Sequence, residues 1–481
     1  MLEKQHDKQK IHEKELATIG KGAGISFAGK LLGGGLQYFY AVFVARILGA
    51  ESFGILMIGI TIINFAGVIS RFGLDFGLVR YVSLYNGVGD KARVKGVIVK
   101  SLEYSFFAGL FIGIVLFFNA DAVAVRIFRA PELGGIIKLL SVSLPFSALM
   151  LNSLFSIQGF KIMKYTVYGQ NLFLPVSNLL LVGILLIAGL KIYGVVIAYS
   201  LSVFLASLLS IYFLFKVFPA IKHIKAVYET NELFRFSLPL LLVVLLNFLI
   251  MWTDTLMLGY FRPKNEVGVY NAAVRTALIT SLVLVSFNSI FAPVISDLFN
   301  KREIRKLEAL FKAATKWIYT ISFPLFLLMT LLSKEIMSVF GQEFIGGRNA
   351  FVILAFAQMV NAGVGSVGFI LTMSGRQNLM MYNTLGICLL NIILNFLLIP
   401  PYGILGASVA SCVSVVIINL LMLFEVYVLY KIHPYRLNFL KPTVSGATVF
   451  AMLLLAGYLF PGAGAVQRLL INIQVFITAF I

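Results

Sequence analysis

Charged residues and cysteines are scarce in this chain of 481 residues, and this scarcity excludes several classes of protein. Asp, Glu, Lys and Arg make up 12% of the residues, whereas 60% are hydrophobic and the mean hydropathy is +0.95. A soluble fold of this composition would expose large apolar patches to water. The only two cysteines, Cys388 and Cys412, both fall in long apolar runs, so we expect no disulfide framework.

Histidine is equally rare, which limits the chemistry that the chain can perform. With four scattered histidines and two cysteines, we expect neither a metal site nor a histidine-based catalytic centre. No glycine-rich loop is followed by a Walker-type lysine, so we also expect no bound nucleotide and no cofactor. Residues 1–22 are polar and charged, and they lack the short apolar stretch of a cleavable signal peptide.

Long apolar runs separated by short polar breaks fill the chain instead. A helix needs about 20 mostly apolar residues to cross the ~30 Å hydrocarbon layer of a membrane, and thirteen runs meet that length. Barrel strands would alternate apolar and polar residues, whereas these runs are continuous, so the spans are predicted to be helices. They cover residues 24–48, 53–84, 96–118, 136–160, 166–188, 193–216, 236–260, 267–298, 314–332, 350–374, 379–399, 403–430 and 442–460.

A fourteenth run, residues 467–481, is shorter than the others. As a helix its 15 residues would rise only ~22 Å, so we expect a last helix that is incomplete or only partly inserted. The predicted fold is therefore an all-α polytopic membrane protein with about 14 transmembrane helices.

The 39 basic residues are distributed unevenly among the polar segments. Residues 1–30 and the breaks after even-numbered spans, counted with the adjoining ends of the spans, contain 26 of them, whereas the breaks after odd-numbered spans, counted in the same way, contain 10. Basic loops face the cytoplasm, so this bias predicts a multi-pass protein of the cell membrane with a cytoplasmic N-terminus. Nucleic-acid binding is the other usual reason for a net charge of +19, but these charges form no single patch and we do not expect it.

The chain also contains an internal repeat. Residues 49–55, at the junction of the first two spans, are echoed by residues 263–269 at an offset of 214. Residues 192–198 are echoed by residues 401–407 at an offset of 209. Each half has six spans, an even number, so both halves enter the membrane with the same polarity. A pseudo-two-fold axis along the membrane normal is predicted, with a central cavity between two bundles that rock against one another.

The predicted domains follow from this repeat. Two six-helix bundles are flanked by a polar segment at the start and by two further helices at the end. Their bounds are 1–22 for the cytoplasmic N-terminal segment, 23–217 for the N-terminal bundle, 218–235 for a cytoplasmic linker, 236–431 for the C-terminal bundle and 432–481 for the two terminal helices.

Several motifs resemble those of polysaccharide-transport flippases, which belong to the multidrug, oligosaccharidyl-lipid and polysaccharide exporter superfamily. Their order and spacing match that family over about residues 20–430, and the layout of six, six and two spans matches it as well. The motifs are ARILGAESFG at 45–54, RFGLDFGLVRY at 71–81, TDTLMLGYF at 253–261, VGVYNAAVR at 267–275 and LLNIILNFLLIPPYGILGASVA at 389–410.

This resemblance implies a transport function. The implied substrate is an oligosaccharide linked to polyprenyl phosphate or diphosphate, which the protein would move from the cytoplasmic to the outer leaflet. The two terminal helices resemble a pair proposed to form a groove for the lipid tail. The expected partners are this substrate and membrane lipids, and the candidates beyond them are a coupling ion and polysaccharide-assembly enzymes.

Ionisable residues inside spans cost ~2.5–3.5 kcal/mol on insertion scales, so they indicate a pathway or an ion pair. Arg275 lies about 8 residues into the eighth span and is a candidate cation for the substrate phosphate. Asp254, at a similar depth in the seventh span, is a candidate partner of Arg275 in the cavity. Lys30, in the first span, is either a second cavity cation or a side chain that reaches the cytoplasmic interface.

A second set of ionisable residues lies in the second span, toward its cytoplasmic end. Arg71 and Asp75 are four residues apart, so on a helix they share a face and can neutralise one another. Arg80 lies near them. We expect a structural ion pair or a cytoplasmic gate here, with direct substrate contact as the alternative.

Two other functions stay open at this point. An ion-coupled small-molecule antiporter of the multidrug type would have a compact acidic site in its first bundle, where Asp75 is the only central acid. A membrane polysaccharide polymerase or ligase would carry a large external loop with catalytic residues. The longest external breaks, near 119–135 and 333–349, offer few such residues, so we do not expect an enzyme.

Overall fold

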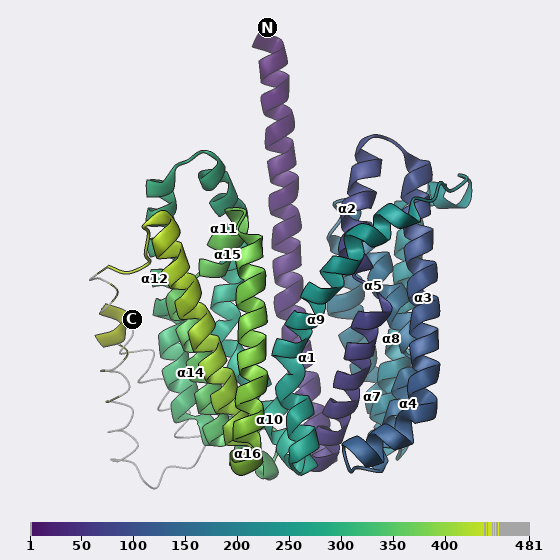
Figure 1. The fold of residues 1–481 in the computed structure, drawn as a ribbon, viewed down its shortest axis with the longest axis vertical. Coiled ribbons are helices and arrows are strands. Elements are labelled where there is room, and N and C mark those ends of the chain that lie inside the picture. The colour runs from purple at the N-terminus through teal and green to yellow at the C-terminus, as the bar shows by residue number, and fades with distance from the viewer. Residues whose placement is uncertain are drawn as a thin grey trace. The chain divides into compact units, whose positions relative to one another are not determined.

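The computed structural model describes residues 2–436, 439, 441–444, 446, 448 and 451, and its regular elements over that part of the chain are all helices (Figure 1). Side chains are described from residue 24 onward, apart from those of residues 25–27, 222, 289, 290 and 293. The expected all-α fold is confirmed. Helices suit an apolar solvent because each one satisfies its own backbone hydrogen bonds.

Within the described residues, eight helices are long and apolar enough to cross a membrane, or up to ten if each of two bent pairs is one span. The two longest, α1 (Leu2–Ser70) and α16 (Gln377–Tyr430), contain glycines with non-helical backbone angles, Gly49 and Gly403. Each is two helices joined at a corner, and Figure 1 shows the arms of α16 side by side. Once these corners are counted, the first twelve predicted spans all fall on described helices.

The other helices are shorter, and several are interrupted. The first bent pair, α4 with α5, turns by 45°, and the second, η5 and α14 with α15, turns by 50°. The α-helices are α2 (Leu74–Gly87), α3 (Lys91–Ala122), α4 (Glu132–Ser141), α5 (Leu144–Gly159), α6 (Lys164–Thr166), α7 (Leu174–Ile187), α8 (Lys191–Val217), α9 (Thr230–Phe261), α10 (Lys264–Ala277), α11 (Leu282–Asn300), α12 (Ile304–Leu331), α13 (Ser333–Ser338), α14 (Arg348–Val364) and α15 (Val367–Met373). The π and 3-10 segments are η1 (Val123–Ile127), η2 (Val167–Phe173), η3 (Pro219–Lys222), η4 (Leu278–Ser281) and η5 (Gln342–Gly347).

The last two predicted spans fall largely outside this description. The span at 442–460 begins among the described residues, but most of it lies outside them, and the run at 467–481 lies wholly outside them.

The chain divides into two compact units. Unit 1 comprises Met1–Val44 and Ile55–Trp252, and unit 2 comprises Ala45–Gly54 and Thr253–Ile481. The division therefore falls inside α9, later than the predicted linker, and it places a short piece of α1 with the second half of the chain. The predicted bounds of the two six-helix bundles, 23–217 and 236–431, stay a prediction.

Each unit has its own apolar core. In unit 1 the core cluster includes Leu78 of α2, Ile98 of α3 and Leu154 of α5. In unit 2 a separate cluster includes Phe311 of α12 and Leu371 of α15. Long apolar helices can bury such side chains against one another and still face lipid on their outer side.

Two glycines related by the internal repeat contact one another within unit 2. A Cβ atom on Gly54 would lie 1.8 Å from the carbonyl oxygen of Lys264, and one on Gly268 would lie 2.1 Å from the carbonyl oxygen of Ala50. Ala50 and Lys264 are separated by 214 residues, as the two glycines are. The two contacts are therefore reciprocal, which is what a two-fold relation between the repeats produces.

Candidate functional site

A buried carboxylate lies inside unit 2. Asp254, on α9, is 5% exposed. The hydroxyl of Tyr270, on α10, donates to its Oδ2 at 2.5 Å, and the Nδ2 of Asn395, on α16, donates to its Oδ1 at 2.6 Å. The hydroxyl of Ser411, on the second arm of α16, also donates to Oδ2. Side chains from three helices therefore converge on one carboxylate.

A second layer of polar groups supports these contacts. The Nδ2 of Asn395 also donates to the Oδ1 of Asn391 at 3.0 Å, and the Nδ2 of Asn391 donates to the hydroxyl of Ser414 at 3.3 Å. One residue further along α9 and α10, the Nδ2 of Asn271 donates to the hydroxyl of Thr255 at 3.2 Å. The Oδ1 of Asn395 is buried and has no hydrogen-bond partner among the described residues.

The corner of α16 brings both of its arms to this cluster. Gly403 has φ 55° and ψ −129°, and a Cβ atom there would lie 2.2 Å from the Oε2 of Glu266. That carboxylate accepts the backbone N–H of Ile404 at 3.2 Å, which caps the second arm, and its Oε1 pairs with Arg262 at 2.7 Å. Glu266 and Arg262 therefore fix the ends of α9 and α10 to the corner that positions Asn395 and Ser411.

The cluster places a carboxylate among apolar helices with neutral hydrogen-bond donors around it. Each hydrogen bond described for Asp254 comes from a neutral hydroxyl or amide group. Neutral donors stabilise a carboxylate, but they do not cancel its charge, and a charge in a membrane span is costly. Hydroxyl and amide oxygens are also good ligands for small hard cations. Chemically, the arrangement can exchange a proton or bind a small cation.

Two of the basic residues singled out from the sequence lie in different units. Arg275 is partly exposed on α10, five residues beyond Tyr270, or about 7.5 Å along the helix. Lys30 is exposed on the first arm of α1 in unit 1. The hydrogen bonds described for Asp254 come from Tyr270, Asn395 and Ser411.

Arg71 and Asp75 form a largely buried ion pair in unit 1. The Nε of Arg71 lies 3.1 Å from the Oδ1 of Asp75, and each side chain is 11% exposed. The Nη1 of Arg71 also donates to the carbonyl oxygen of Gly67 at 2.8 Å. The chain breaks between α1 and α2 at this point, where Phe72 and Gly73 have positive φ values of 51° and 71°. The pair therefore connects the two sides of a helix break.

Arg80 lies on α2 and is exposed, with its guanidinium 4.3 Å from the centre of the Phe236 ring on α9. The same two helices are close at Gly73, where a Cβ atom would lie 2.3 Å from the carbonyl oxygen of Ser237. Arg80 therefore packs over the first half of α9 within unit 1, one to two turns beyond the ion pair of Arg71 and Asp75.

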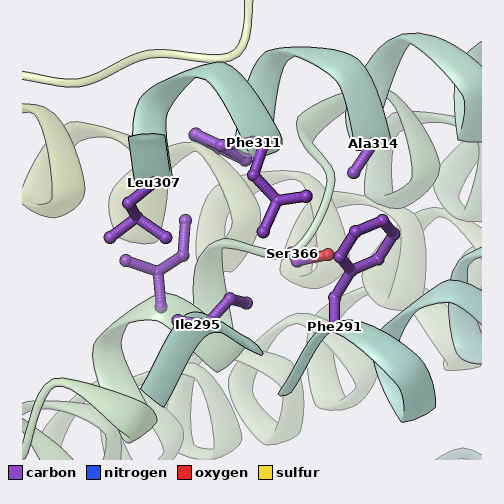
Figure 2. Close-up of a pocket in the computed structure, with 8 residues that line it drawn as sticks. Phe291, Ile295, Leu307, Phe311, Ala314 and Ser366 are labelled. Carbon is purple, nitrogen blue, oxygen red and sulfur yellow. The ribbon is translucent and has the colours of Figure 1, made fainter. Parts of the chain in front are cut away.

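A small pocket lies between α11, α12 and α15 in unit 2. Figure 2 shows Phe291 and Ile295 on one side of it and Leu307 and Phe311 on the other. Among its described lining residues, Ser366 is the polar one, and its hydroxyl donates to the Oδ1 of Asn288 at 2.5 Å. The described lining contains no charged residue, so it does not suit a phosphate or a sugar. Its lining residues are Phe291, Ile295, Leu307, Leu310, Phe311, Ala314, Ser366 and Ile370.

Sequence reasoning found part of the Asp254 cluster. It singled out Asp254. It did not single out Tyr270 or Ser411. The available signal was weak, because a tyrosine and a serine are common in membrane helices and Ser411 is 157 residues from Asp254.

Comparison with known proteins finds two family models and several relatives that match the chain. A family model described as polysaccharide biosynthesis protein matches residues 19–299, and a MatE model matches residues 239–397. The probable low-salt glycan biosynthesis flippase Agl15 of Haloferax volcanii is 25% identical over 395 residues, which cover 81% of this chain and 79% of the relative.

Two solved structures share the fold over most of their length. The inward closed conformation of the lipid II flippase MurJ has a TM-score of 0.74 and 16% identity, covering 95% of this chain and 96% of that one. An inward-facing multidrug resistance MATE family transporter of the MOP superfamily has a TM-score of 0.70 and 17% identity, covering 82% and 96%. The first family model covers more than half of the sequence, so the chain belongs to the polysaccharide biosynthesis protein family.

Proposed function

We propose that this chain is a flippase, which moves an oligosaccharide linked to polyprenyl phosphate or diphosphate from the cytoplasmic to the outer leaflet by alternating access. Membership of the family carries this proposal, together with similarity over 81% of the chain to a relative named as a glycan biosynthesis flippase. The orientation, with a cytoplasmic N-terminus in the cell membrane, rests on the distribution of basic residues.

Such a substrate has a polar head and an apolar tail, and the helices carry a few basic side chains that could bind the head. The sugar and phosphate must avoid hydrocarbon, whereas the polyprenyl tail favours it, so the protein has to shield only the head. Arg275 and Lys30 are the basic side chains that we propose for the phosphate, because a cation inside a span is costly unless it has an aqueous or anionic neighbour. Arg71, Asp75 and Arg80 are proposed to act at a cytoplasmic gate.

We further propose that the Asp254 cluster couples transport to a small cation or a proton. The supporting observation is a buried carboxylate with neutral donors, beside the buried Oδ1 of Asn395, which has no partner in the described part of the chain. A cation at this position would gain oxygen ligands from Asp254, Asn395 and Ser411 and would cancel the buried charge. An ion gradient acting on such a site would supply the energy for transport without a nucleotide. The sequence shows no ATP-binding motif.

Reconstitution into vesicles tests the flippase proposal. A fluorescent short-chain polyprenyl diphosphate glycan placed in both leaflets is quenched from outside with dithionite, and a flippase raises the fraction quenched above the half expected for empty vesicles. Imposed Na⁺, K⁺ and pH gradients then identify the coupling ion. If the quenched fraction stays at one half under every gradient, the proposed activity is wrong.

The match to the MatE model favours one alternative, an ion-coupled small-molecule antiporter. Export of cationic dyes from the same vesicles, with no effect on the lipid probe, would support it. We expect no enzymatic product from the lipid-linked glycan in either case. Polysaccharide-assembly enzymes stay candidate partners, and purification with such an enzyme under mild detergent would support that association.

Thiol labelling tests the orientation separately. Cysteines introduced in the segments 86–95, 300–312 and 431–441 should be protected from an impermeant reagent added outside intact cells. Cysteines near 121–134 and 335–348 should react. The opposite pattern would reverse the proposed direction of transport.

A further inference from the structure

The ten-residue segment Ala45–Gly54 is continuous with unit 1 on both sides, yet it groups with unit 2. The segment contains the corner of α1 at Gly49, whose φ of 78° and ψ of 172° end one helical arm before the next begins at Ala50. On the proposed orientation this corner faces the outer side of the membrane. Three contacts tie it to unit 2, and each involves different chemistry.

The first contact is a helix cap supplied from far along the sequence. The backbone N–H of Ala50 donates to the Oε2 of Glu343 at 2.8 Å, and a Cβ atom on Gly49 would lie 3.3 Å from the same oxygen. Glu343 belongs to η5, in the predicted external break between the ninth and tenth spans. A carboxylate at a helix N-terminus satisfies a free amide and interacts favourably with the helix dipole.

The second contact is apolar and lies beside the cap. The ring of Phe53 meets the ring of Phe344 edge-on, with 6.1 Å between their centres. Both side chains are almost fully buried, at 0% and 1% exposure. Residues 343 and 344 of η5 therefore fasten the corner with a hydrogen bond and an aromatic pair.

The third contact is the reciprocal crossing of Gly54 and Gly268 described above. Carbonyl oxygens of Lys264 and Ala50 occupy the positions where Cβ atoms would be, so neither glycine has room for a side chain. Only a backbone that lacks Cβ atoms permits this approach, and the approach brings together repeat-related junctions of the two halves of the sequence.

From these contacts we propose that the crossing of Gly54 and Gly268 is the outer seal of the transport pathway, and that Glu343 is the positioning residue that keeps it closed. The inference rests on alternating access in the proposed function. Release of the glycan to the outer side requires repeat-related parts of the chain to separate there. The segment Ala45–Gly54 is covalently continuous with unit 1, but its contacts are made with unit 2. We therefore expect these contacts to break when the outer side opens.

A cross-link tests whether the seal has to open. In protein lacking Cys388 and Cys412, cysteines replace Phe53 and Phe344 and are joined by a short bifunctional thiol reagent with a cleavable centre. The cross-linked protein should lose flipping, and cleavage of the reagent should restore it. Flipping at the uncross-linked rate after complete cross-linking would overturn the proposal. If the parent protein flips no probe before cross-linking, the proposed function fails instead, and the cap is tested as follows.

Hydrogen exchange on otherwise unaltered protein tests the role of Glu343 without any substrate. Glu343→Ala should raise the exchange rate of amides in residues 50–54 about fivefold or more, a typical effect of losing one coupling contact. Glu343→Gln retains an acceptor oxygen and should have a smaller effect. The matched control is Glu132→Ala, which removes an exposed glutamate from the first turn of α4 in the other long external break.

Glycine substitutions separate a seal from a merely rigid corner. Gly54→Ala and Gly268→Ala should shift the protein toward the open corner and expose residues 50–54 to exchange while membrane abundance stays near normal. Gly386→Ala, at a helical glycine with nothing within 4 Å of the added Cβ, is the control. If exchange in residues 50–54 is the same in Glu343→Ala, Gly54→Ala and the two controls, the corner is static and the proposal is wrong.

Discussion

Asp75 in unit 1 and Asp254 in unit 2 are both buried in apolar helices, at 8% and 5% exposure, yet their charges are balanced in opposite ways. Asp75 has the guanidinium of Arg71 at 3.1 Å. Asp254 accepts hydrogen bonds from Tyr270, Asn395 and Ser411, which carry no charge. Among the described residues, the first carboxylate has a charged partner, whereas the donors to the second are all neutral.

This difference separates a structural role from a transport role. A permanent ion pair has little tendency to bind a transported ion, because its charge is already cancelled inside the protein. A carboxylate with neutral neighbours changes its net charge when a cation or a proton arrives, and the surrounding helices respond. The contrast supports our proposal that ion coupling occurs at the contacts between α9, α10 and α16, and that the break between α1 and α2 serves stability or gating.

The largest expected effect is at Asp254. Asp254→Asn preserves size and one acceptor oxygen but removes the charge, so it should lower flipping on the order of 100-fold, which corresponds to ~3 kcal/mol of lost cation binding. Membrane abundance should stay near normal, because an amide is cheaper to bury than an unpaired carboxylate. The vesicle assay and a fluorescence-detected yield of solubilised protein measure the two quantities. A variant that retains full ion-dependent flipping would end the assignment of coupling to this cluster.

The same substitution in the other unit should do the reverse. Asp75→Asn leaves the buried charge of Arg71 without a partner and should destabilise the fold by ~3–5 kcal/mol, which lowers abundance. The double change Arg71→Met with Asp75→Leu should restore abundance, because no unpaired charge is left. Flipping restored together with abundance indicates a structural pair. A well-folded double variant that does not flip indicates a gate.

Arg275 should give an intermediate effect. Arg275→Ala removes the proposed phosphate ligand and should lower flipping by at least about tenfold, or ~1.4 kcal/mol, with near-normal abundance. Arg275→Lys should rescue only part of the activity, because an ammonium group lacks the paired donors of a guanidinium. The double change Arg275→Ala with Asp254→Ala is the control for a hidden ion pair. Full transport by that double variant would exclude a phosphate role for Arg275.

The twelve spans that the structure describes could be predicted because helices in lipid form from local sequence, each satisfying its own backbone. The pair of Arg71 and Asp75 could be predicted for the same reason, since four residues separate its members. The sequence shows the junctions around Gly54 and Gly268 as a repeat, but it does not show that they contact one another. A glycine allows another segment to approach closely, but it does not indicate which segment does so.

The cluster around Asp254 was harder to predict for a physical reason. Its partners reach it through tertiary packing, across 16 residues for Tyr270 and 157 for Ser411. No regular spacing in the sequence predicts a contact between residues that are this far apart. The corner at Gly403 decides which face of the second arm of α16 meets α9, and its conformation depends on the distant cap from Glu266.

Ser411 offers the finest test of the contrast, because its neighbour Ser408 is a matched control on the same arm of α16. The hydroxyl of Ser411 donates to Asp254, whereas that of Ser408 donates to the carbonyl oxygen of Ile404 at 2.8 Å within its own helix. Ser411→Ala removes one oxygen ligand and should raise the half-maximal concentration of the coupling ion about fivefold, which corresponds to ~1 kcal/mol. Ser408→Ala should leave that concentration unchanged. Equal shifts in the two variants would mean that the ion responds to general packing of α16, and the distinction between the two aspartates would then rest on Asp254 alone.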